Sequence, residues 1–151
     1  MENQNNEMML INKEDIAGAQ ALDALNNPGA SFFCSIPNDG SRAATVAIYN
    51  AINNKGESLD DHKGEVINMV NVAAHPVSLT DEKTGEVINA LRMVIIDDQG
   101  RNFDAVSQGI ASSMEKIFAI VGPAPFDPPL AIKVVEQKTR SGFKTNTIEL
   151  V

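Results

Sequence analysis

The sequence has little of what enzymes and secreted proteins are usually built on. It contains one cysteine, two histidines and no tryptophan in 151 residues. The single cysteine, Cys34, excludes an intramolecular disulfide and cannot form a metal site by itself. No apolar run approaches the roughly twenty residues that a membrane-spanning helix needs. The opening residues, MENQNNEMML, lack the basic segment and apolar core of a signal peptide. We therefore expect the protein to reside in a cytoplasm, where conditions are reducing.

Catalytic motifs are absent as well. The sequence has no phosphate-binding glycine-rich loop, no nucleophile elbow and no metalloprotease helix motif. Asp60, Asp61 and His62 form a short cluster that could bind a divalent cation, but a solvated acidic loop is the commoner meaning of such a cluster. Cys34 has no histidine near it in the sequence, and a buried inert thiol is the better interpretation. The sequence therefore predicts a protein that is not an enzyme and that needs no metal or cofactor.

Positive charge is scarce and unevenly distributed. The net charge of −8 disfavours a protein that coats duplex nucleic acid by bulk electrostatics. Residues 1–62 carry nine acidic and three basic side chains, and residues 63–151 carry eleven and nine. From Leu130 onward, four cations face only Glu136 and Glu149. A site for an anionic polymer is therefore expected to be local and near the C-terminal end of the sequence.

The chain is organised around residues 102–122, where the hydrophobic period changes from two to about 3.6. The first few of these residues alternate as in a strand. The later apolar residues recur at helical spacing: Ile110, Met114, Ile117, Phe118 and Val121. Ser107 is a suitable N-cap, and Gly122 followed by Pro123 ends the periodic segment. The pattern predicts a helix over Gln108–Val121.

Three strands are expected before this helix and two after it. The first, Glu65–Leu79, changes its inward parity partway, as a bent or bulged strand does. The second covers Val87–Asp97, and a tight turn leads to the third, Arg101–Val106. After the helix, alternation from Leu130 and a Ser141-Gly142 turn predict a hairpin that ends at Leu150. This order is that of the five-stranded oligonucleotide- and oligosaccharide-binding (OB) barrel, so the expected fold is mainly β.

Two segments precede the expected barrel. The sequence divides into residues 1–28, an acidic tail and helix; residues 29–62, a β-hairpin and acidic linker; and residues 63–151, the OB-fold domain. Within the second part, Ser31–Ile36 has the composition of a strand. The run Ala43–Ile52 is either a strand or a short helix, and the Asn-Asp-Gly turn before it favours a strand over Thr45–Tyr49. It is left open whether residues 30–52 extend the barrel sheet.

Barrels of this type bind single strands on the face of their second and third strands and with two of their loops. Cations follow the phosphate backbone and aromatic rings stack on the bases. The candidate cations are Arg92, Arg101, Lys133, Lys138, Arg140 and Lys144, and the candidate stacking rings are Phe103, Phe143 and Tyr49. Phe103 has slightly better than even odds of being a core residue. The cations of the last hairpin could equally be solvated charges that discourage the edge of the sheet from pairing with another chain.

Three segments resemble a family of single-stranded DNA-binding proteins from tailed phages that infect Gram-positive bacteria. They are SFFCSIPNDGSRAATVAIYNAIN, HPVSLTDEKTGEVINALRMVIIDDQGRNFDAVSQGIASSMEKIFAIVG and PPLAIKVVEQKTRSGFKTNTIEL. The resemblance implies cooperative, sequence-tolerant coating of single-stranded DNA during phage DNA replication or recombination, in the cytoplasm of the bacterial host and without cofactor or catalysis. It names no individual binding residues.

Family members of this sort often end in an acidic tail that recruits partners, whereas this sequence ends TIELV after its last strand. We hypothesise that the acidic N-terminal part contacts phage replication or recombination proteins instead. Self-association of the chain is left open, and no membrane partner is expected. The main alternative is a phage protein–protein interaction module on the same barrel, without nucleic acid, which the net charge of −8 supports.

Overall fold

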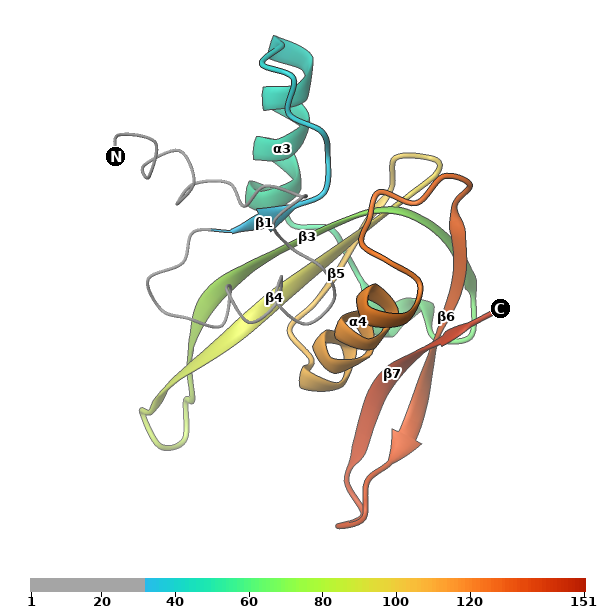
Figure 1. Ribbon diagram of the computed structural model, residues 1–151. Coiled ribbons are helices and arrows are strands. Elements are labelled where there is room, and N and C mark those ends of the chain that lie inside the picture. The colour runs from blue at the N-terminus through green and yellow to red at the C-terminus, as the bar shows by residue number, and fades with distance from the viewer. Residues whose placement is uncertain (1–31) are drawn as a thin grey trace.

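The computed structural model describes residues 32–151, so the tail and helix expected over residues 1–28 lie outside the described part. This part is a curled, mixed β-sheet with two α-helices (Figure 1). The elements are β1 (Phe33–Cys34), α3 (Arg42–Asn53), β2 (Glu57–Ser58), the 3₁₀ helix η2 (Leu59–His62), β3 (Val66–Thr80), β4 (Val87–Asp97), β5 (Asn102–Ala105), α4 (Gln108–Ile120), β6 (Leu130–Lys138) and β7 (Lys144–Leu150).

The sheet follows the path β2-β5-β4-β3-β6-β7, and β1 pairs with β3 beside this path. All neighbours are antiparallel except β2 and β5. The described residues contain seven strands in one sheet. Five of them, β3 to β7, lie where the sequence predicts barrel strands, β1 lies within the strand expected over Ser31–Ile36, and β2 has no counterpart in the prediction. The architecture is mainly β and consistent with an OB-like fold.

The long strand β3 makes the sheet curl. Its first residues, Val66–Met69, pair with β6, and the remainder pairs with β4. The register shifts between Met69 and Asn71, which is the irregularity that the change of parity predicts. A bulge bends a strand and increases its twist, so one strand can serve both parts of a curled sheet.

Helix α4 packs inside the curl (Figure 1). The hydroxyl of Ser107 caps it by accepting a hydrogen bond from the backbone N–H of Ile110, at 3.4 Å. Gly122 follows with a φ of +119°, a conformation that side chains rarely adopt. The buried face of the helix consists of Ile110, Ala111, Met114, Ile117 and Phe118. The helix that the sequence predicts is therefore confirmed, one residue shorter at its end.

Two hairpins extend beyond this core, and both point to the same side of the molecule in Figure 1. We call residues 77–90 the β3–β4 arm and residues 136–146 the β6–β7 arm. Neither arm contributes a residue to the main hydrophobic core cluster.

The strand expected over Thr45–Tyr49 is wrong, because this segment belongs to α3. The hydroxyl of Ser41 accepts from the N–H of Ala44 at 3.1 Å and caps the helix. Alanine is the strongest helix former, and the segment RAATVAIYNAIN contains four. Ile48 and Ala51 lie one helical turn apart and are the buried residues of α3. The turn before the helix therefore leads into an N-cap and does not close a β-hairpin.

The segment before residue 63 contributes to the same core as the strands that follow. Strand β1 has two residues and pairs with β3, with Phe33 opposite Ala74. Leu59 begins η2 and is fully buried, as is Phe33. Both belong to one hydrophobic cluster with Ile95 of β4. The boundary at residues 62 and 63 stays a prediction, and the two sides of it share a core.

Candidate nucleic-acid interface

The β6–β7 arm presents an exposed aromatic ring. Phe143 lies in the turn and is 73% exposed. Its carbonyl oxygen accepts from the N–H of Thr139 at 2.7 Å, and the N–H of Gly142 donates to the carbonyl of Thr139 at 3.0 Å. Gly142 has a φ of +89°, which glycine adopts without strain. The turn therefore holds the ring outward on a hydrogen-bonded scaffold.

Three cations lie in the same arm as this ring. Lys138 and Lys144 lie directly opposite each other in the β6–β7 register, and Arg140 is in the turn. Among residues 32–151, none of the three forms an ion pair. Like charges directly opposite each other destabilise a hairpin. The arm therefore carries three positive charges that no ion pair among the described residues neutralises.

Two further candidate cations lie on other parts of the surface. Lys133 is half-buried on β6, opposite Glu149 of β7. Arg101 precedes β5, and its Nε donates to Asp97 Oδ2 at 2.8 Å. This hydrogen bond raises the pKa of the Arg101 guanidinium, which also lies 5.3 Å from the centre of the Phe103 ring. The Arg101 side chain is half exposed and lies on a different turn from the arm.

The Arg92 guanidinium forms its hydrogen bonds within the protein. Its Nη1 donates to the carbonyl of Ile52 at 3.0 Å, and its Nη2 donates to the carbonyl of Asn54 at 2.7 Å and to Asp104 Oδ2 at 2.8 Å. Nη1 also lies 3.0 Å from Nε2 of His75. The end of α3 and the residues after it therefore cover Arg92. This part of the face of β4 and β5, where the sequence analysis expected DNA, is occupied by the chain itself.

The structure corrects the assignment of Phe103 as a stacking ring. Phe103 is 1% exposed and belongs to the main core, where its ring lies edge-on to His62 at a centroid distance of 4.9 Å. A base cannot stack on a ring that has no exposed face. Tyr49 is 63% exposed, but it lies on α3, which stands at the opposite end of the molecule from the two arms (Figure 1).

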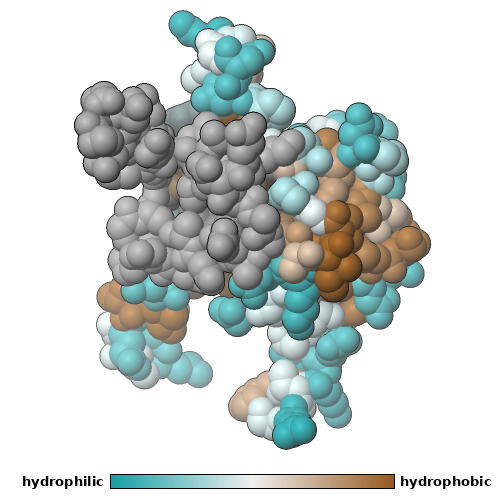
Figure 2. Space-filling model, in the orientation of Figure 1, coloured by the Kyte–Doolittle hydropathy of each residue, from teal (hydrophilic) through white to brown (hydrophobic). Residues whose placement is uncertain are grey.

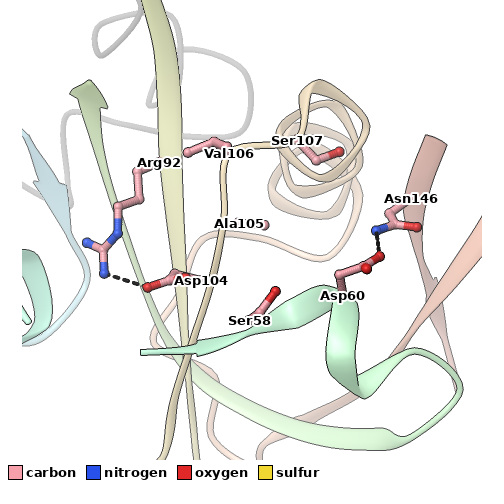
Figure 3. Close-up of a pocket in the computed structure, with 8 residues that line it drawn as sticks. All are labelled: Ser58, Asp60, Arg92, Asp104, Ala105, Val106, Ser107 and Asn146. Carbon is pink, nitrogen blue, oxygen red and sulfur yellow. Dashed lines mark hydrogen bonds and ion pairs between the residues drawn. The ribbon is translucent and has the colours of Figure 1, made fainter. Parts of the chain in front are cut away.

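A pocket of about 390 Å³ lies where β2, β5, α4 and β7 meet (Figure 3). Its lining residues are Ser58, Asp60, Arg92, Asp104, Ala105, Val106, Ser107 and Asn146. The amide of Asn146 donates to Asp60 Oδ1 at 2.8 Å across one side of it. Hydroxyls and carboxylates suit a neutral hydrogen-bonding group better than a phosphate. Sequence reasoning missed this pocket because its residues come from separate segments that only the fold brings together.

The acidic cluster of residues 60–62 is bonded within the protein. The hydrogen bond from Asn146 and then the contact with Lys63 hold the pKa of Asp60 below its ordinary value. His62 Nε2 lies 2.8 Å from Glu57 Oε1, and its Nδ1 lies 3.1 Å from Glu65 Oε1. Within residues 32–151, no three potential ligands come together in a way that could hold a metal ion. In the same part of the chain, no helix is long and apolar enough to cross a membrane.

Comparison with known proteins identifies a family. A family model described as phage single-stranded DNA-binding protein matches residues 29–151, which is most of the chain. No curated protein and no solved structure matches at a significant level. The match includes α3, both arms and every strand of the sheet.

Proposed function

Because the chain belongs to the family of phage single-stranded DNA-binding proteins, we propose that it coats single-stranded DNA during phage DNA replication or recombination. The binding is tolerant of sequence and combines base stacking with backbone electrostatics. The observation that carries this mechanism is the β6–β7 arm, where Phe143 is largely exposed between Lys138, Arg140 and Lys144. Stacking tolerates any base, because every base has a π-face.

The DNA path that we propose starts at the tip of the β6–β7 arm and continues toward Lys133 on the same strand. Arg101 is a separate backbone contact at the β4–β5 turn. Arg92 has a structural part in this proposal, since its guanidinium already binds two carbonyls and Asp104. Tyr49 stays a candidate for stacking on a distant stretch of the same strand, because α3 lies far from the arm (Figure 1).

We assign β3 to β7, with α4, to a five-stranded OB barrel. The order β5-β4-β3-β6-β7 in the sheet and the position of α4 between β5 and β6 support this assignment. Strands β1 and β2 and helix α3 are additions to that barrel. In this assignment α3 and the residues after it cover part of the face that such barrels commonly use, which is the reason for placing the DNA on the arm.

The remaining parts of the proposal concern context. The protein acts in the cytoplasm of the bacterial host, without a cofactor or a catalysed reaction, and its family is described by DNA binding alone. The acidic residues 1–28 contact phage replication or recombination proteins. Deletion of residues 1–28 should then abolish such a contact and leave DNA affinity intact, and a collapse of DNA affinity would contradict it.

The test is a fluorescence-anisotropy titration of a labelled poly-thymidine oligomer with the full chain, at several salt concentrations and beside a duplex of equal length. We expect a preference for the single strand and a logarithmic affinity that falls linearly with the logarithm of salt, by about 0.7 for each phosphate contacted. Absence of binding at low salt would contradict the mechanism. DNA binding that does not depend on salt would contradict the role given to backbone electrostatics.

A further inference from the structure

The β3–β4 arm differs in chemistry from the β6–β7 arm. Leu79 and Ile88 are directly opposite each other in the register, so their side chains share one face of the arm. Ile88 is 49% exposed, and Val87 beside it is 66% exposed. Figure 2 shows an apolar area over this arm. The loop at its tip carries three acidic side chains and one lysine, namely Asp81, Glu82, Glu86 and Lys83.

This combination is unsuited to single-stranded DNA. Acidic side chains at the tip repel phosphates, and the exposed side chains next to them are aliphatic and have no aromatic face for a base. Apolar side chains bordered by charge are instead typical of a surface that contacts protein. The chemistry of the β3–β4 arm therefore favours contact with protein over contact with DNA.

A surface of matching chemistry lies on another side of the same chain. A groove of about 290 Å³ runs between α4 and β7. It is lined by Ser113, Lys116, Ile117, Ile120, Val121, Gln137, Thr147, Ile148 and Leu150. Ile120 at its border is 83% exposed, and Val121 and Leu150 are also exposed. Figure 2 shows apolar surface on the side of the molecule where α4 ends and β6 lies. Lys116 is the charged residue of the lining.

We propose that the β3–β4 arm of one copy docks into the α4–β7 groove of a second copy, so that copies of this chain associate head to tail. The aliphatic face of the arm fills the apolar groove, and the acidic tip meets Lys116. Two different surfaces take part, so a docked pair still has one free arm and one free groove to which further copies can add. Such an open row suits a linear polymer, and the groove does not include residues 138–144 at the tip of the β6–β7 arm.

The test is sedimentation velocity of the full chain over a range of concentrations, without DNA. The arm variant is Leu79→Asp with Ile88→Asp, and the groove variant is Ile120→Asp. Val46→Asp on α3 is the matched control, because Val46 is an exposed aliphatic residue outside both surfaces. We expect the native chain and the control to associate, and each docking variant to do so at least about tenfold more weakly. Circular dichroism and thermal unfolding check that every variant is folded.

Mixing distinguishes head-to-tail docking from other contacts. An equal mixture of the arm variant and the groove variant retains one intact arm–groove pair, so it should form dimers and nothing larger. In a charge exchange, Lys116→Glu alone weakens association, and Lys116→Glu with Glu82→Lys in one chain restores it. A native chain that stays monomeric at all concentrations, a mixture that stays monomeric, or folded variants that associate like the native chain would each overturn the proposal.

Discussion

Arg92 and Asp104 form an ion pair between neighbouring strands, with Nη2 and Oδ2 2.8 Å apart, and together they hold a third segment in place. The same carboxylate oxygen accepts from the backbone N–H of Gly56 at 2.8 Å. Arg92 also binds the carbonyls of Ile52 and Asn54. Both side chains are largely buried. One cation therefore fastens the end of α3 and the residues after it to β4 and β5.

The first prediction follows from this network. Arg92→Ala should lower the free energy of unfolding by roughly 2–3 kcal/mol, because hydrogen bonds to a charged group are lost and Asp104 keeps its charge without a partner. Urea denaturation measures the loss. The folded variant should keep the salt dependence of single-strand binding of the native chain. A flatter salt dependence with unchanged stability would instead place Arg92 on the DNA.

Phe143→Ala should weaken binding to single-stranded DNA by about 1–3 kcal/mol, the usual contribution of one stacked base. Stability should hardly change, since the ring is largely exposed. Phe143→Tyr keeps a π-face and should bind like the native chain, whereas Phe143→Leu keeps apolar bulk and should bind like the alanine variant. Anisotropy titrations with poly-thymidine and with a mixed sequence measure the effect. Equal binding by the leucine variant and the native chain would exclude stacking at this position.

Replacing Lys138, Arg140 and Lys144 by glutamine should flatten the salt dependence of binding. Each phosphate contact contributes about 0.7 to the slope of log affinity against log salt on single strands, so three contacts predict a change of about 2. Lys83→Gln at the tip of the β3–β4 arm is the matched control and should leave the slope unchanged. If the triple variant has the slope of the native chain, these cations do not contact the backbone.

Because of the two histidines, the free energy of unfolding should be greatest near pH 6.5. Hydrogen bonds to Glu65 and then to Glu57 raise the pKa of His62, so its contribution is complete below the ordinary value of about 6.5 and is lost as pH rises through the raised pKa. Burial and then the charge of Arg92 lower the pKa of His75, so its contribution is complete above about 6.5 and is lost as pH falls through the lowered pKa.

Urea denaturation between about pH 5 and 8, the range in which histidine titrates, tests this pattern. His62→Gln should remove the decline on the alkaline side, and His75→Gln should remove the decline on the acidic side. A stability that rises steadily from pH 6.5 to 8 in the native chain would contradict the role given to His62.

Gly109→Ala should destabilise the protein, although alanine within a helix ordinarily stabilises it by about 0.5–1 kcal/mol relative to glycine. A Cβ at Gly109 would collide with the backbone carbonyl of Asn146 and with the hydroxyl of Thr145 on β7. Overpacking of this kind costs about 1–3 kcal/mol. Thermal unfolding measures the sign, with Ser112→Ala in the same helix as the control. A gain in stability would mean that α4 can move away from β7 without loss.

Much of the fold from residue 65 onward could be predicted from the sequence. The bounds of β4, the capping of α4 by Ser107 and the irregularity in β3 each leave a local pattern in the sequence, namely a strand bounded by turns, a cap residue before a helical repeat, and a change of parity. The residues of the β6–β7 arm could be named for the same reason, since Lys138, Arg140, Phe143 and Lys144 lie within seven positions. What they bind stays a prediction until the titrations are made.

Long-range contacts decided what the sequence could not. A strand and a helix were both compatible with the pattern of Ala43–Ile52, and packing of Ile48 in a cluster with Cys34, Ala73 and Val94 goes with the helix. Arg92 resembles any cation on a strand, yet its partners come from positions about 40 residues earlier in the chain and from β5. The alternation of Phe103 with polar neighbours was compatible with both a core residue and a stacking ring, and the fold places it in the core. The sequence by itself determined which local elements form, because they depend on neighbours. Only the tertiary structure decided which side chains remain available for binding, because burial and pairing depend on distant residues.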